Sequence, residues 1–415
     1  MNVNIAKGKS VVIMLFPILF IIMPRPPLNS TDFLVYPIIG LFCLYFTIVI
    51  SKNYRFNMRV LFISFVIMLY SISISISAFF SNITLGFGAL IHIFKPLLFI
   101  LCLIFGYFIG VSCKSDKIFR YLLKAAYIII LVQIVIGLAQ LFGLHLFDII
   151  YSPSKARSLG QIVRITGTLD NPNLFAWFVI QMTLIIYLFE NNKIKKILFI
   201  IIGVLLVFLS GSRTLFCLFP VILLMTQILL SNKNAKYYFT KIPKYIFLFI
   251  SFVCVAYWFI NRYGDYFPYI KQLLTIVKTG SLSSVNSFYA RTLMWDDAIA
   301  QINNQSGFTT LLFGLGPGAI KVLDNDYLYS VANYGFLGLV TNIIIYIVLF
   351  YQFKKESSLN FSLLGKLYIV FSFILGLQFE TLNGWNFPIL IMFYAGIAIA
   401  LRKNHTSTST RLYQN

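Results

Sequence analysis

The sequence consists mainly of apolar runs of about 20 residues separated by short polar segments. In helical conformation, a run of this length spans the hydrocarbon core of a bilayer. Since 59% of the 415 residues are hydrophobic and only 11% are charged, no soluble core of this size would bury all the apolar surface. The expected spans lie at about 10–23, 32–51, 59–80, 90–112, 122–143, 172–189, 194–209, 214–231, 244–260, 331–352, 362–380 and 385–401. The chain therefore predicts an all-α membrane protein with about twelve transmembrane helices.

The distribution of lysine and arginine predicts how these helices are oriented. With the N-terminus in the cytoplasm, 21 of the 33 basic residues lie in cytoplasmic segments, and the short outer turns contain only Arg25 and Arg213. Such a bias is typical of inner-membrane proteins. We therefore expect both termini to be cytoplasmic, and the first run to be a retained helix rather than a cleaved signal peptide. Because the basic residues cluster between apolar runs, the net charge of +21 does not indicate nucleic-acid binding.

Two outer segments, 144–171 and 261–330, are too long to be simple turns. The larger one includes a stretch with helical spacing, 287–303, followed by a glycine-rich turn, "LFGLGPG", at 312–318. We expect short helices in this loop and a close backbone approach at the turn. The predicted organisation is helices one to nine within 1–260, with the first outer loop at 144–171, the large loop at 261–330, helices ten to twelve within 331–402, and a cytoplasmic tail at 403–415.

The polar chemistry gathers on the expected outer side. Nine of the twelve acidic residues lie there, interleaved with arginines, which predicts a site built from outer loops at the rim of the helix bundle. Arg213, in "LSGSRT", is either an interfacial arginine or an anion ligand at the start of the next helix; we favour the anion ligand. Lys95 is the single basic residue well inside a span, so it is either functional or extends outward to the head groups.

Arg291 and Trp295 lie four residues apart in "FYARTLMWDDA", and therefore share a helical face. Their side chains either stack within the loop or point the guanidinium group toward the mouth of the bundle. Tyr289, in the same motif, is a candidate for substrate contact.

The segment "DNDYLYSVANYGFLG", which begins at Asp324, opens the tenth span. Asp324 is a candidate general base, but a helix cap or a metal ligand together with Asp326 are alternatives. Because no third carboxylate stands nearby in the sequence, we expect neither a metal nor a cofactor. Asn325 and Tyr327 are candidate substrate-binding residues, whereas Gly335 is expected to permit close helix packing.

The segment "RITGTLDNPNLFAWF", 164–178, leads into the sixth span. Pro172 suits a helix start, and either Asn171 or Asn173 is a suitable N-cap. Arg164, Asp170 and Asn173 are also candidates for contact with a sugar or a phosphate.

Taken together, these motifs resemble those of the O-antigen polymerases of the Wzy type and the related O-antigen ligases. The resemblance extends over nearly the whole chain as topology, and as motifs it comprises "GTLDNPN", "SGSRT", "ARTLMWDDA", "FGLGPG" and "DNDYLYSVANYGFLG" in this order. It implies a GT-C-like, inverting, metal-independent glycosyltransferase that uses glycan linked to undecaprenyl diphosphate. Arg213 and Arg291 would hold the diphosphate, and Asp324 would orient or deprotonate the attacking hydroxyl. A repeat-unit flippase and a chain-length regulator would be partners.

One position distinguishes the branches of this superfamily. Ligases typically have a histidine before the asparagine of the matching motif, whereas here Asp324 precedes Asn325. The resemblance therefore favours a polysaccharide polymerase over a ligase. A transporter or flippase is the third alternative. It predicts charges that line the middle of several spans, where almost none is found apart from Lys95.

Overall fold

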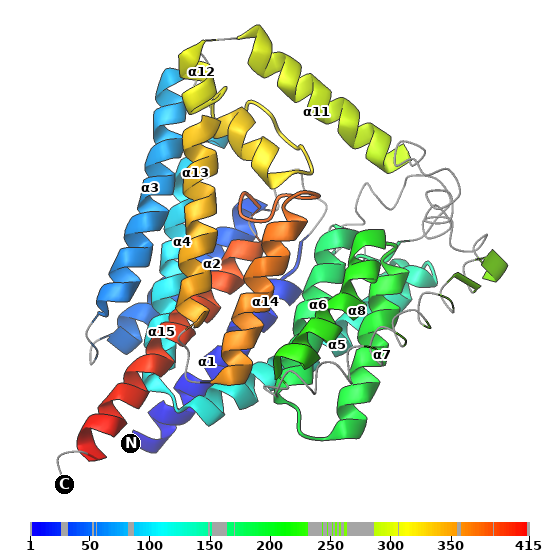
Figure 1. Ribbon diagram of the computed structural model, residues 1–415. Helices are drawn as coiled ribbons and strands as arrows, with labels where there is room; N and C mark the ends of the chain where they lie inside the picture. Colours follow the sequence, from blue (N-terminus) through cyan, green and yellow to red (C-terminus); the bar gives the residue numbers. More distant parts are fainter. Residues whose placement is uncertain are drawn as a thin grey trace. The chain divides into compact units, whose positions relative to one another are not determined.

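The computed structural model describes most of the chain in a series of segments. The described residues are 2–25, 32–51, 54, 56–81, 87–147, 150–151, 164–169, 171–230, 243, 247, 251, 254, 257–258, 261–263, 286–305, 307–354, 358–384 and 386–412. Within these residues the regular secondary structure is helical, and no strand occurs (Figure 1). The expectation of an all-α protein is confirmed for this part of the chain.

Helices coincide with eleven of the twelve expected spans, while the ninth, 244–260, lies largely outside the described residues. The helices are α1 (Asn2–Ile22), α2 (Asp32–Ser51), α3 (Met58–Phe80), α4 (Phe87–Ser112), α5 (Ser115–Leu141), α6 (Pro172–Phe189), α7 (Lys193–Leu209), α8 (Arg213–Leu230), α11 (Asn286–Asn304), α12 (Phe308–Phe313), α13 (Asp326–Lys354), α14 (Leu359–Leu375) and α15 (Asn386–Leu412), with a 3-10 turn, η1, at His145–Phe147.

Six of the described helices are long and apolar enough to cross a membrane. They are the helices at Met58–Phe80, Ala89–Ser112, Ser115–Leu141, Pro172–Phe189, Arg213–Leu230 and Asp326–Phe353. Four shorter apolar helices accompany them, at Val11–Ile22, Val35–Ser51, Leu359–Leu375 and Asn386–Arg402. Their length and composition are those of a helical membrane protein.

The chain divides into two compact units. Unit 1 comprises Met1–Ser10, Ile38–Ser115 and Ser287–Asn415, and unit 2 comprises Val11–Pro37 and Asp116–Asn286. Unit 1 therefore contains α3, α4 and α12 to α15, together with most of α2 and α11. Unit 2 contains α5 to α8 and the apolar part of α1.

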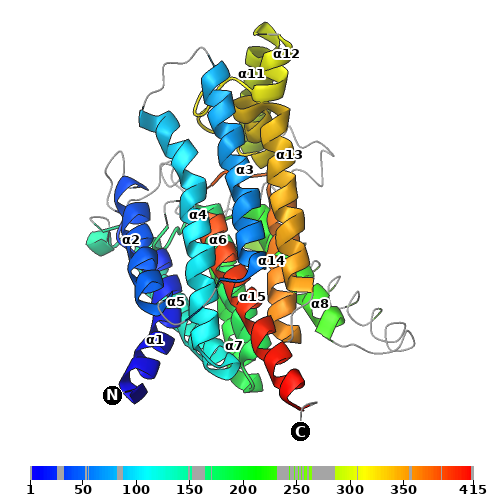
Figure 2. The same ribbon diagram turned by 90° about the vertical axis from the view of Figure 1, so that its left-hand side faces the viewer.

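Close packing of α4 against α15 forms the centre of unit 1 (Figure 2). A Cβ atom built on Gly106 would lie 2.2 Å from the carbonyl oxygen of Phe393, and one on Gly396 would lie 2.2 Å from that of Leu103. Only glycine permits this separation of the two backbones, as is common for helices that associate in a membrane. The two helices therefore form a rigid pair on which the ends of the neighbouring helices are supported.

A break in α13 fixes the position of the turn "LFGLGPG". Gly335 lies inside α13 with φ 67° and ψ −168°, so the short first part of the helix leaves the axis of the longer part (Figure 1). The break frees carbonyl groups, and Leu315 N donates to Ala332 O at 2.8 Å. A Cβ atom on Gly335 would lie 2.3 Å from Leu312 O, which confirms the prediction that this glycine permits close packing.

Candidate functional site

The predicted site residues are distributed over both units, and the structure therefore describes two groups. Unit 1 contains Lys95, Tyr289, Arg291, Trp295, Asp324, Asn325 and Tyr327, and unit 2 contains Arg164, Asn173 and Arg213. Asp170 lies outside the described residues. We call Asp324, Asp326 and Glu380 in unit 1 the acidic cluster, and Arg164 with residues 210–213 in unit 2 the arginine turn.

Asp324 forms an ion pair with Arg291 of α11. The Nε atom of Arg291 lies 3.0 Å from Oδ2 of Asp324, and the two side chains are 19% and 32% exposed. Asp324 has a φ of 49°, the one positive value of a non-glycine residue in the described part of the chain. Such a conformation costs free energy and is retained where the surrounding structure holds it. The pair therefore presents a fixed carboxylate and a fixed guanidinium group at a partly open position.

The other predicted residues of α11 lie around this ion pair. Trp295 Nε1 donates a hydrogen bond to Leu323 O at 2.7 Å, so Arg291 and Trp295 both contact the segment before α13. The prediction that they share a face is confirmed. The side chain of Tyr289 is 54% exposed, which leaves it accessible to a ligand.

Asn325 and Tyr327 form hydrogen bonds that stabilise the start of α13. The side chain of Asn325 accepts hydrogen bonds from the backbone N–H groups of Tyr327 (3.1 Å) and Leu328 (3.0 Å), as an N-cap of α13. The Tyr327 hydroxyl donates to Phe373 O of α14. Both residues therefore hold the start of α13 in place beside Asp324.

Asp326 is the buried anchor of the acidic cluster, and its role could not be read from the sequence. Its side chain is 0% exposed. The carboxylate accepts hydrogen bonds from Asn383 N (2.9 Å), Asn383 Nδ2 (2.9 Å), Leu382 N (3.1 Å), Thr381 Oγ1 (3.0 Å) and Asn342 Nδ2 (3.4 Å). These bonds fix the loop at 376–384 against α13. The five donors compensate for the loss of water around the carboxylate.

Lys95 of α4 also contacts the loop that Asp326 holds. Its side chain is 6% exposed, and Nζ donates to Asn383 O. The ammonium group is thus directed into the protein, so the alternative in which Lys95 extends outward to head groups is wrong. Its positive charge lowers the pKa of Glu380, a member of the acidic cluster.

Glu380 lies in the loop between α14 and α15, close to Asp324 in space. Its Oε1 atom accepts a hydrogen bond from Leu323 N at 3.3 Å. Burial raises the pKa of Glu380 to about 7; Lys95 opposes this rise, while Asp326 and Asp324 add to it. In the sequence Glu380 was one of nine outer acidic residues with nothing to single it out.

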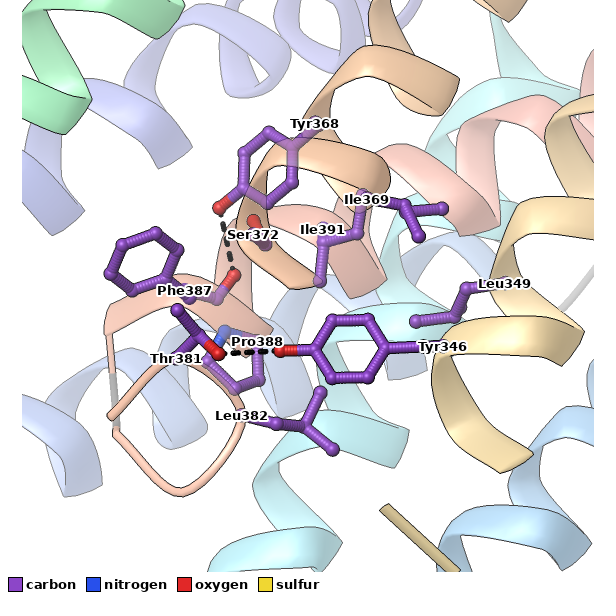
Figure 3. A pocket seen from close by; sticks show the side chains of 10 residues that line it. All are labelled: Tyr346, Leu349, Tyr368, Ile369, Ser372, Thr381, Leu382, Phe387, Pro388 and Ile391. Atoms are coloured by element: carbon purple, nitrogen blue, oxygen red, sulfur yellow. Dashed lines mark hydrogen bonds between the residues drawn. The ribbon is translucent and has the colours of Figure 1, made fainter. Parts of the chain in front are cut away.

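A small pocket lies between α13, α14, α15 and the loop that contains Glu380 (Figure 3). Its lining is apolar except for hydroxyl groups, three of which take part in hydrogen bonds within the protein. Tyr346 shares a hydrogen bond with Thr381 at 2.5 Å, and the Tyr368 hydroxyl donates to Phe387 O at 2.9 Å. Because none of the ten residues that line it is charged, the pocket offers no acid or base for a reaction.

The arginine turn of unit 2 brings two predicted residues into one place. Arg164 Nε donates to Ser210 O at 2.8 Å, and Arg213 is the first residue of α8, three positions further on. Gly211 has a φ of 66°, and a Cβ atom built there would lie 3.0 Å from Arg164 Nε. Arg164 therefore contacts the turn that leads into α8, and Arg213 begins that helix, where backbone N–H groups also favour an anion.

Two buried glutamines hold the segment 164–169 beside this turn. The Oε1 atom of Gln140 accepts from Thr166 N (2.8 Å) and Gly167 N (2.9 Å), and that of Gln133 accepts from Thr168 N (3.0 Å). Both glutamines come from α5, and their polarity inside an apolar run was the available sequence signal.

The start of α6 confirms the prediction of an asparagine N-cap. Asn171 fills this position, since its side chain accepts from Asn173 N at 2.8 Å. Asn173 itself lies in the first turn of the helix, where the structure gives its side chain a partly buried position.

No protein-family model matches this chain, and no curated protein sequence matches it. Within the described residues, no group of three or more His, Cys, Asp or Glu side chains is placed to hold a metal ion. The fold and composition define the class as a helical membrane protein, and any narrower function depends on the two clusters.

Proposed function

We propose that this chain is a polysaccharide polymerase of a bacterial inner membrane. It transfers a glycan from undecaprenyl diphosphate to the next lipid-linked repeat unit, on the outer side of the bilayer. The observation that carries the proposal is the fixed Arg291–Asp324 ion pair, at 3.0 Å, beside the start of a long apolar helix. The pair supplies a cation and a carboxylate, which are the two kinds of group that the proposed reaction uses.

The chemistry requires groups of these two kinds. A hydroxyl group of the acceptor sugar attacks the anomeric carbon, the bond to the diphosphate breaks, and the diphosphate leaves with the electron pair. Arginine side chains neutralise the developing charge through paired N–H groups, and we propose this role for Arg291 within unit 1 and, separately, for Arg213 within unit 2. Arg164, Asp170, Asn173, Lys95, Tyr289, Trp295, Asn325 and Tyr327 are the proposed substrate-binding or supporting residues.

The direction of the helices in unit 1 supports the proposed topology. α14 ends near the acidic cluster, whereas α13 and α15 begin there, since Asn383 bonds to Asp326. The end of α3 lies beside α13, where Ser77 Oγ donates to Asn333 O at 2.6 Å. In a twelve-span topology with cytoplasmic termini, these four ends all face outward. The acidic cluster would then lie at the outer surface, where the carrier lipid presents its sugar.

The test is the surface glycan of a strain that lacks the gene, complemented with wild type, Arg213→Ala, Arg291→Ala or Arg262→Ala. Arg262 is exposed and serves as the matched control. We expect the wild type and the control to restore a polymer ladder, and the other two variants to leave single repeat units at normal protein levels. A normal ladder from both variants would refute the assignment of the arginines.

The same experiment separates the alternatives. If the deletion strain accumulates long polymer on the carrier lipid, the protein is a ligase that passes finished glycan to lipid A core or another acceptor. If the surface glycan is unchanged, the transporter or flippase reading gains support. The ligase reading lacks a histidine before Asn325, where Asp324 stands.

A further inference from the structure

The three carboxylates of the acidic cluster differ in how completely they are engaged. Asp326 is fully buried and accepts five hydrogen bonds, and Asp324 is paired with Arg291. Glu380 is only partly buried, and its one hydrogen bond in the described structure uses Oε1. Its second oxygen, Oε2, has no hydrogen-bond donor among the described residues. One acid of the three is therefore free to accept a proton from a ligand.

We propose that Glu380 is the proton acceptor for the attacking sugar hydroxyl, and that Asp324 is a positioning residue held by Arg291. This inference rests on the proposed function and names the base within the same site. The geometry supports the division of roles, because Glu380 Oε1 is bonded to Leu323 N, the residue next to Asp324. The carboxyl group of Glu380 therefore lies beside the residue that precedes the ion-paired Asp324.

The step balances as a simple transfer. The acceptor O–H bond breaks as its proton passes to Glu380 Oε2, and the acceptor oxygen forms a bond to the anomeric carbon. The bond from that carbon to the diphosphate oxygen breaks, and the lipid diphosphate departs with the electron pair. Glu380 then releases the proton to water, which restores the carboxylate.

The surroundings of Glu380 suit this role near neutral pH. A base is most effective when its pKa lies near the operating pH, and burial raises the pKa of Glu380 to about 7. The charged groups that act on it are Lys95 from α4, Asp326 of α13 and Asp324 beside it. Tyr70 of α3 and Tyr329 of α13 also interact with it electrostatically.

The test measures polymer formation by the full-length protein in proteoliposomes supplied with lipid-linked repeat units, across pH 5.5 to 8.5. For the wild type, we expect the rate to rise about tenfold per pH unit below pH 7 and to level off above it, since only the carboxylate accepts a proton. Glu380→Gln should lose about 10²- to 10⁴-fold in rate and should lack this rise. Glu380→Asp should retain the rise at a reduced rate.

Two further variants distinguish catalysis from structure. Lys95→Gln keeps a donor for Asn383 O but removes the charge that lowers the pKa of Glu380, so its rate profile should shift to higher pH. Glu190→Gln, at the C-cap of α6 in unit 2, is the control and should leave the profile unchanged. All variants are checked for folding by thermal unfolding in detergent.

The outcomes separate this inference from the function itself. If the wild type makes polymer and Glu380→Gln matches it in rate and pH profile, Glu380 is not the base while the polymerase proposal stands. The proposed function fails if the wild type makes no polymer in proteoliposomes and if membranes that contain it restore polymer to an extract of the deletion strain no better than empty membranes. An inactive but folded Glu380→Gln with an unshifted Lys95→Gln profile would also overturn the role of the carboxylate.

Discussion

Two irregular segments, one in each unit, are tied to helices by buried side chains of different kinds. In unit 1 the loop at 376–384 is held by the carboxylate of Asp326, whereas in unit 2 the segment 164–169 is held by the neutral amides of Gln133 and Gln140. Inside a membrane protein, irregular backbone requires internal hydrogen-bond partners because lipid supplies none. Both segments meet this requirement through buried side chains.

The two anchors differ in the hydrogen-bonding groups that can surround them. A carboxylate only accepts hydrogen bonds, so all five groups around Asp326 are donors. An amide both accepts and donates, and Gln140 uses both functions, since its Nε2 atom also donates to Gly167 O at 2.9 Å. A charged anchor therefore gives stronger bonds, but its removal leaves more groups unsatisfied.

The largest effect is expected for the charged anchor. Asp326→Ala should lower the free energy of unfolding by about 3–5 kcal/mol, because buried donors lose their common acceptor. Asp326→Asn should be almost as harmful, since its amide group would face donors whichever way it turned. Thermal unfolding in detergent and the yield of monodisperse protein measure both effects.

The exposed acid Asp297 of α11 provides the control. Asp297→Ala should change stability by less than about 0.5 kcal/mol, as is usual for surface positions. A stable Asp326→Asn variant with normal yield would contradict the role of Asp326 as a charged anchor, and the two segments would then differ less than the structure indicates.

An intermediate effect is expected for the neutral anchor. Gln140→Leu keeps most of the volume but removes the partners of Thr166 N, Gly167 N and Gly167 O, and should cost about 2–3 kcal/mol. Gln140→Glu should cost as much, because a buried charge would face the Gly167 carbonyl oxygen. Unfolding is measured as before, with the exposed Gln301→Leu as control. A Gln140→Glu variant as stable as wild type would show that unit 2 accepts a charged anchor.

Much of the fold could be predicted from the sequence because membrane helices are encoded locally. Apolar runs predicted the positions of the described helices, and the glycines of "LFGLGPG" predicted a tight turn. The shared face of Arg291 and Trp295 follows from helical spacing alone. These features depend on residues that are neighbours in the chain.

The site was harder to predict because its decisive contacts join distant residues. Asp326 and Asn383 are 57 positions apart, and nothing in either motif indicates that they bond. Glu380 was therefore not distinguished from other outer acids, and Asp326 was grouped with Asp324 as a carboxylate pair. The structure distinguishes the two aspartates, since Asp326 is buried as an anchor and Asp324 is paired with Arg291.

The smallest effect on stability is expected at the Arg291–Asp324 ion pair. Because both side chains remain partly exposed, water screens their attraction, and such pairs contribute about 0–1 kcal/mol. Arg291→Gln should therefore unfold within about 1 kcal/mol of wild type while it makes no long polymer. Unfolding in detergent and the glycan ladder, measured on the same preparation, give both quantities. If the variant unfolded as readily as Asp326→Ala, the pair would be a second anchor of the fold, and the loss of polymer would report folding rather than chemistry.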